Sequence, residues 1–145
     1  VWPLRATITA TKEFRMARKT IQTDQAPAAI GPYAQAVRTG DLVFVSGQIP
    51  LDPLTMTLVE GGVDAQTRRV FDNLQAVCQA AGGSLEDICK MTIYLTDLGH
   101  FATVNGIMAE YFGDVTPARA AIGVNELPKS AMVEIEAILS FADHG

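Results

Sequence analysis

The sequence is poor in the residues that build metal centres and disulfide frameworks, with only two cysteines and two histidines among 145 residues. His100 and His144 stand far apart, and neither has a second ligand three or four residues further on, so we expect no metal site. Cys78 and Cys89 form no C-x-x-C pair. We expect both to be buried free thiols in a reducing compartment, which predicts a cytoplasmic protein.

Long apolar runs and basic residues are also scarce. No apolar run approaches the roughly 20 residues that cross a bilayer, and the length suits one soluble domain with a proper core. The first 19 residues hold five of the 11 basic residues and one of the 16 acidic ones, so the rest carries a net charge of about −9. Such a body repels nucleic acid and anionic membranes, because phosphate binding needs clustered Lys and Arg.

Residues 1–15 show no periodicity and end just before Met16, which opens the segment "MARKTIQT". We interpret them as a leader, a vector remnant or a flexible extension in front of a single domain over residues 16–145. A basic transit peptide fits less well, because Glu13 and the lack of clear amphipathicity count against it.

The remaining patterns predict the order β-β-α-β-α-β-β. The segment "AVRTGDLVFVSGQI" predicts a hairpin that turns at residues 39–41. Apolar residues at helical spacing predict two helices, over residues 63–81 and 101–112, that end at Gly82-Gly83 and Gly113. Alternating or apolar runs predict strands over residues 88–95, 119–125 and 132–141.

This order predicts an α+β fold, an α/β sandwich with two helices on one face of a mixed sheet. The last strand points Val133, Ile135 and Ala137 one way and Glu134 and Glu136 the other, together with further alternating residues up to Phe141. An uncovered face that is half apolar and half charged is typical of a protein that closes against its own copies. We therefore expect a symmetric homo-oligomer.

Arg119 is the candidate functional residue to which the sequence pattern alone points. Ser46 lacks the first glycine of G-x-S-x-G, and Cys78 lies on the apolar stripe of a helix, so neither is interpreted as a nucleophile. Arg119 shares a strand face with small or polar residues, which leaves room for an anionic ligand. It can equally pair with Glu134 or Glu136, and the sequence does not set the register that would decide.

Four segments then carry a resemblance to a known family. "APAAIGPYAQAV", "VFVSGQIPLDP", "FATVN" and "PARAAIGVNELPKSAMVEIEAI" resemble, in matching order, the signature segments of the RidA (YjgF) family of imine and enamine deaminases. The resemblance runs from about Lys19 to Phe141, nearly the whole chain.

The resemblance implies a chorismate-mutase-like fold and a homotrimer whose sheets form a central barrel, with active sites at the subunit clefts. It also implies hydrolysis of 2-imino acids such as 2-iminopropanoate and 2-iminobutanoate to 2-keto acids and ammonia. No cofactor is implied. The partners would be these small molecules and other copies of the chain, with neither nucleic acid nor membrane.

Carried onto this sequence, the resemblance assigns the substrate carboxylate to Arg119 and the attacking water to Glu134. A guanidinium suits the first task because its fork matches a carboxylate bidentately. A carboxylate suits the second if partial burial raises its pKa. The further substrate-contacting residues that the resemblance implies are Tyr33, Ser46, Gly47, Asn105 and Ala121.

Two departures from the family pattern and two rival functions stay open. Ala121 stands where many members have cysteine, which excludes thiol chemistry there, and the short connection over residues 113–116 can reshape the cleft rim. A non-catalytic trimeric module that binds small keto acids or carboxylates is the alternative, although the presence of both Arg119 and Glu134 favours the enzyme. An RNase or translation-inhibitor role suits the acidic body poorly.

Overall fold

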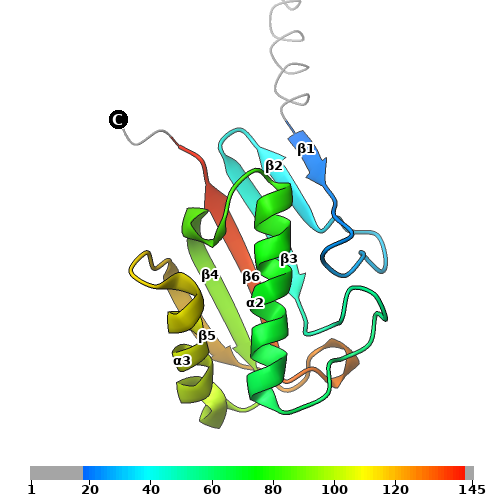
Figure 1. The fold of residues 1–145 in the computed structure, drawn as a ribbon, viewed down its shortest axis with the longest axis vertical. Coiled ribbons are helices and arrows are strands. Elements are labelled where there is room, and N and C mark those ends of the chain that lie inside the picture. Colours follow the sequence, from blue (N-terminus) through cyan, green and yellow to red (C-terminus); the bar gives the residue numbers. More distant parts are fainter. Residues whose placement is uncertain (1–17, 143–145) are drawn as a thin grey trace, which may run out of the picture.

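The computed structural model describes residues 18–142 and shows a six-stranded mixed sheet with two α-helices on one of its faces (Figure 1). The sheet order is β1-β2-β3-β6-β4-β5, in which β4 and β5 run parallel and all other neighbours antiparallel. The predicted fold class is confirmed. The elements are β1 (Arg18–Ile21), β2 (Ala36–Thr39), β3 (Leu42–Gln48), α2 (Val63–Ala80), β4 (Ile88–Leu95), α3 (Phe101–Phe112), β5 (Ala118–Gly123) and β6 (Val133–Ser140).

The core lies between the sheet and α2, along the apolar stripe that the sequence predicts. Val70, Leu74, Val77 and Cys78 have no exposed surface, and Phe71 between them is equally buried. Burial raises the pKa of the Cys78 thiol to about 12, so this cysteine is inert at neutral pH. Strand β1 was not predicted, because only one of its four residues is buried and so short a segment shows no periodicity.

The prediction that Cys89 is buried is wrong. Ile88 pairs with Leu139 and Lys90 with Ile138, so β4 holds one extra residue at Cys89. This bulge interrupts the alternation, and Ile88 and Met91 both face the core while Cys89 is exposed. The bulge was not predicted, because Cys89 is itself apolar and fits a regular alternation with Met91 and Ile93.

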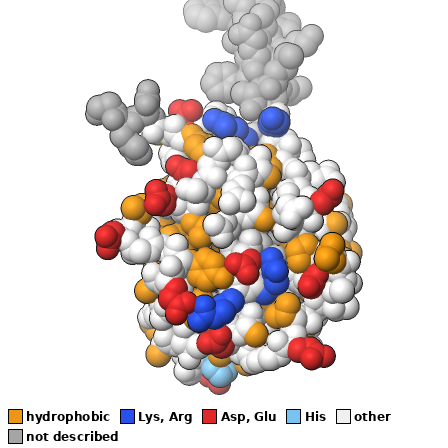
Figure 2. Space-filling view, viewed as in Figure 1, with side chains coloured by type: hydrophobic (Ala, Val, Ile, Leu, Met, Phe, Trp, Pro, Cys, Tyr) orange, Lys and Arg blue, Asp and Glu red, His pale blue; other side chains and the backbone are white. Residues whose placement is uncertain are grey.

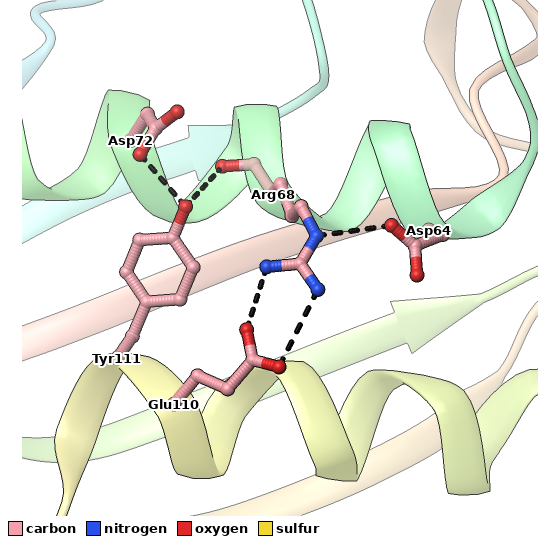
Figure 3. A network of polar contacts seen from close by, with 5 residues as sticks. All are labelled: Asp64, Arg68, Asp72, Glu110 and Tyr111. Atoms are coloured by element: carbon pink, nitrogen blue, oxygen red, sulfur yellow. Dashed lines mark hydrogen bonds and ion pairs between the residues drawn. The ribbon is translucent and has the colours of Figure 1, made fainter.

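A polar network holds α3 against α2 (Figure 3). Arg68 of α2 donates to Asp64 Oδ1 at 3.0 Å and to Glu110 Oε2 on α3 at 2.6 Å. The Tyr111 hydroxyl donates to Asp72 Oδ1 at 2.8 Å. Exposed ion pairs contribute little stability, but together these bonds fix the position of the helix that carries Asn105.

The other face of the sheet has no helix over it and is both apolar and charged, as predicted. Phe44 of β3 is 44% exposed, and Ile138 and Glu136 of β6 and Lys90 of β4 line a hollow beside it. On the opposite, helix-covered face, Lys and Arg side chains lie among Asp and Glu side chains in the lower part of the view, and further basic side chains stand at its upper edge (Figure 2).

Among residues 18–142, no three His, Cys, Asp or Glu side chains gather as a metal-binding cluster. His100 lies directly before α3, with its Nε2 3.8 Å from Asp97 Oδ2, whereas His144 and the predicted extension over 1–15 fall outside the described residues. None of the described helices has the length and apolar character to cross a membrane.

Candidate active site

Glu134 lies on the helix-free face of the sheet, directly over Gly47. Glu134 stands on β6 between Val133 and Ile135, which are fully buried in the core, so its side chain points away from α2 and α3. A Cβ atom at position 47 would lie 2.6 Å from Glu134 Oε2 and 2.8 Å from its Cδ. Glycine is therefore required at position 47 for the carboxylate to keep this place.

A bulge in β3 shapes the backbone beneath this carboxylate. Val45 pairs with Ala137, and Gln48 pairs with Ile135. Two residues of β3, Ser46 and Gly47, therefore stand opposite a single residue of β6, which is a β-bulge. Ser46 Oγ donates to the Ala34 carbonyl at 2.6 Å, and Ser46 N donates to the Gln35 carbonyl at 3.0 Å. These bonds tie the bulge to the segment that carries Tyr33.

Gln35 fixes that segment in turn. It is almost fully buried, its Oε1 accepts from Thr23 N at 2.7 Å, and its Nε2 donates to the Pro27 carbonyl at 2.8 Å. The exposed Tyr33 ring lies above, with its hydroxyl accepting from Ile30 N at 3.2 Å. Sequence reasoning did not single out Gln35, because a buried glutamine that bonds backbone groups has no motif of its own.

A cavity of about 610 Å³ opens at this place. It brings together four of the predicted residues, Tyr33, Ser46, Gly47 and Glu134. Its remaining polar lining comes from Gln35, Gln48, Lys129 and Glu136, and its apolar lining from Pro27, Ala28, Ile30, Ile49, Leu51 and Pro128. A cavity with apolar walls and a few polar groups is typical of a small-molecule site.

The electrostatics of the cavity suit a general base. Partial burial raises the pKa of the Glu134 carboxyl above its ordinary value, and the neighbouring negative charge of Glu136 raises it further. Glu134 is therefore a stronger base than an exposed glutamate, and a strong base can accept a proton from water.

Arg119 stands elsewhere, on the helix side of the sheet. It pairs with the fully buried Met91, so its side chain points toward α3. There Nη1 donates to Asn105 Oδ1 and lies 3.4 Å from Met108 Sδ. The guanidinium carbon is 5.1 Å from the centroid of the Phe101 ring, which adds a cation–π contact.

Arg119 and Asn105 line a second cavity, of about 390 Å³. The short connection after α3 forms its rim through Gly113, Thr116 and Pro117. Phe101 is a site residue that sequence reasoning missed, and its place one helical turn before Asn105 is the signal that points to it. Ala121, two residues after Arg119, packs partly against the core.

The ion-pair alternative for Arg119 is wrong within one chain. Arg119 lies on the helix side and Glu134 and Glu136 on the other, and among residues 18–142 Arg119 forms no ion pair. For the same reason a single chain does not bring Arg119 and Glu134 together. Six of the predicted residues fall into two groups, whereas the predicted Ala121 lines neither cavity. We call these groups the glutamate half-site (Tyr33, Ser46, Gly47, Glu134) and the arginine half-site (Asn105 and Arg119, together with Phe101).

Comparison with known proteins agrees with this fold. The model of the family described as Endoribonuclease L-PSP matches residues 23–140. A crystal structure of RidA from the Antarctic bacterium Psychrobacter sp. is 51% identical and superimposes with a TM-score of 0.82, covering 85% of this chain and 99% of that one. The chain therefore belongs to the RidA/YjgF family.

Two curated relatives indicate the range of the family. A RutC family protein of Pyrococcus abyssi is 49% identical over 85% of this chain and 97% of its own length. A mouse protein named 2-iminobutanoate/2-iminopropanoate deaminase is 46% identical over 83% of this chain and 90% of its own length. The family thus includes an imine deaminase, and the chain matches both relatives over nearly their full lengths.

Proposed function

We propose that the protein hydrolyses small 2-imino acids, such as 2-iminopropanoate and 2-iminobutanoate, to 2-keto acids and ammonia. The observation that carries this proposal is the partly buried Glu134 carboxylate, placed over Gly47 in a cavity and made more basic by its surroundings. The mouse deaminase in the same family supports the choice of substrate.

The reaction needs a group that binds the substrate carboxylate, a base that activates water and an acid that protonates the leaving nitrogen. The two half-sites provide these groups. Arg119, oriented by Asn105 and Phe101, binds the substrate carboxylate. The imine reacts in its protonated form: Glu134 accepts a proton from the water as the water oxygen bonds to the C=N carbon, and a neutral tetrahedral amino alcohol forms. The protonated Glu134 then returns its proton to the amino nitrogen and the C–N bond breaks to release ammonia. The hydroxyl group loses its proton to solvent as the C=O bond forms.

The two half-sites must come from different copies of the chain for this to work, because the sheet separates them within one chain. We infer a homotrimer in which each cleft combines the glutamate half-site of one copy with the arginine half-site of its neighbour. The exposed apolar residues of the helix-free face, among them Phe44 and Leu42, support burial against a second copy.

The test is to generate 2-iminopropanoate or 2-iminobutanoate in situ and to follow keto acid release with and without the protein. Wild-type protein should accelerate release well beyond the spontaneous rate, and Glu134→Gln protein should not. If keto acids bind to wild type but neither protein accelerates release, the non-catalytic binding module is the better function. Cleavage of RNA is disfavoured by the net charge of about −9 on residues 20–145.

A further inference from the structure

The cavity of the glutamate half-site is lined by a second carboxylate, Glu136, which has no role in the reaction proposed above. Glu136 follows Glu134 by two residues on β6, so both point to the helix-free face and line the same cavity. Glu136 is exposed, whereas Glu134 is half-buried. An exposed glutamate on a strand normally moves between rotamers in water, which would make its charge a poorly defined influence on its neighbour.

Tyr94 prevents that movement. The β4–β6 register sets Tyr94 opposite Glu134, and its hydroxyl reaches diagonally to donate to Glu136 Oε1 at 2.5 Å. Diagonal neighbours in an antiparallel pair are within reach of aromatic side chains, so this bond needs no distortion of the sheet. The bond to Glu136 raises the pKa of the Tyr94 hydroxyl, which therefore keeps its proton and remains a donor at neutral pH.

We propose that Tyr94 is a positioning residue that holds Glu136 as a fixed negative charge beside Glu134 and thereby sets the pH range in which Glu134 acts. The inference rests on the proposed function for its meaning, but the coupling of Tyr94, Glu136 and Glu134 is a property of the sheet alone. Glu136 is not a catalytic residue here, since it acts through Glu134.

The other groups around Glu134 do not replace this charge. On β3 its neighbours are the neutral Ser46 and Gly47, and on β4 they are Tyr94 and Thr92. Lys129, in the loop before β6, and Tyr33, before β2, line the same cavity, and Lys90 of β4 lines the adjacent hollow with Glu136. Within one chain, Glu136 is thus the acidic neighbour that shares the cavity with Glu134. The neighbouring copy's Arg119, which the proposed cleft brings to the same place, is unchanged in every variant compared below.

The sign of the effect follows from the charges. A fixed anion beside Glu134 favours its protonated form, so removal of that anion lowers the pKa of Glu134. Glu136→Gln removes the charge and keeps the shape. Tyr94→Phe keeps the charge but releases it from its fixed place beside Glu134, so it should also lower the pKa of Glu134, and by less.

The experiment is a pH titration of protein labelled with ¹³C at the glutamate carboxyl groups, with the Glu134 signal identified by its absence in Glu134→Gln. The titration midpoint of Glu134 should fall in Glu136→Gln and fall by less in Tyr94→Phe. The double variant should match Glu136→Gln alone, because Tyr94 acts only through the charge of Glu136. Tyr111→Phe is the matched control, since it also removes a tyrosine-to-carboxylate bond, on the helix side, and should change nothing.

An unchanged midpoint in Glu136→Gln, or a Tyr94→Phe effect that persists in the double variant, would overturn the proposal. Activity gives a second readout: the ratio of kcat/KM in Glu136→Gln to that in wild type should be higher at a pH below the wild-type Glu134 midpoint, as the titration gives it, than at pH 8. If no variant and no wild-type protein releases keto acid, the proposed function fails while the titration still decides the coupling.

Discussion

The two half-sites are built by different means. In the glutamate half-site, a β-bulge, a glycine and a set of backbone hydrogen bonds hold the carboxylate, and nearly every partner belongs to the sheet or to the segment before β2. In the arginine half-site, one strand residue meets the side of a helix, through an amide, a thioether and an aromatic ring. The glutamate half-site is a cavity around a base, and the arginine half-site is an exposed cation whose orientation is set by its neighbours.

The difference shows what each half can do without the other. The glutamate half-site can activate a water molecule but offers only Lys129 for an anion, while the arginine half-site can hold a carboxylate but has no base among its lining residues. A 2-imino acid carries both a carboxylate and an electrophilic carbon, and it needs both halves. The comparison therefore predicts that damage to either half abolishes the same activity for different reasons.

The largest effect is expected from Glu134→Gln. Without the general base, kcat/KM for 2-iminopropanoate should fall by about 10²- to 10⁴-fold. The fold should survive: because the pKa of Glu134 is raised in the folded state, its ionisation costs stability once the pH exceeds that pKa, and the glutamine removes this cost. A melting temperature at pH 8 equal to or above that of wild type is expected, and a collapsed one would assign Glu134 a structural role.

Arg119→Lys should lower kcat/KM by about 10- to 150-fold, which corresponds to one lost charge-assisted hydrogen bond. Lysine keeps the charge but gives up the fork that reaches both Asn105 and a substrate. The melting temperature should change little, because Arg119 is exposed and forms no ion pair among residues 18–142. Near-wild-type turnover in this variant would remove Arg119 from the site.

Gly47→Ala should lower kcat/KM by about 10- to 100-fold, because the new methyl group displaces the Glu134 carboxylate and a shift near 1 Å is costly to catalysis. Gly62→Ala is the matched control, since a Cβ there meets nothing within 4 Å. Equal activity in the two variants would mean that the position of Glu134 is not critical.

The smallest effect is expected from thiol modification. Cys89 is exposed and Cys78 is buried with its pKa raised to about 12, so a maleimide should label one thiol per chain under native conditions. Activity should be retained, because neither cysteine lines the cavity of either half-site. Stoichiometric inactivation by the reagent would contradict this.

The sequence predicted the elements of the fold much better than the arrangement of the candidate site residues. The helix over residues 63–81 was predictable because its buried residues recur at the helical period, and the observed helix differs only at its end. The side of the sheet on which Arg119 lies was not predictable, since it depends on the pairing of β5 with β4, and no local pattern sets that register. For that reason the sequence could not decide whether Arg119 forms an ion pair with Glu134.

The exposure of Cys89 and the need for glycine at position 47 were also not predictable from the sequence. The exposure of Cys89 follows from a bulge that a single residue introduces into β4, and the need for glycine at position 47 follows from where Glu134 lies in space. Both depend on contacts between segments that are distant in the sequence, whereas hydrophobic periodicity reports only on neighbours along the chain. The short β1 strand was missed because four residues are too few to show a period.

The central claim is that one active site combines halves of two copies, and subunit mixing tests it most directly. Glu134→Gln and Arg119→Ala proteins, each nearly inactive, are mixed in equal amounts and allowed to exchange subunits, with native mass spectrometry to verify the mixed assemblies. In a trimer with random exchange, about a quarter of the clefts receive an intact Glu134 and an intact Arg119, so about a quarter of wild-type activity should return. Verified mixed assemblies with no more activity than the two separate variants would contradict the claim.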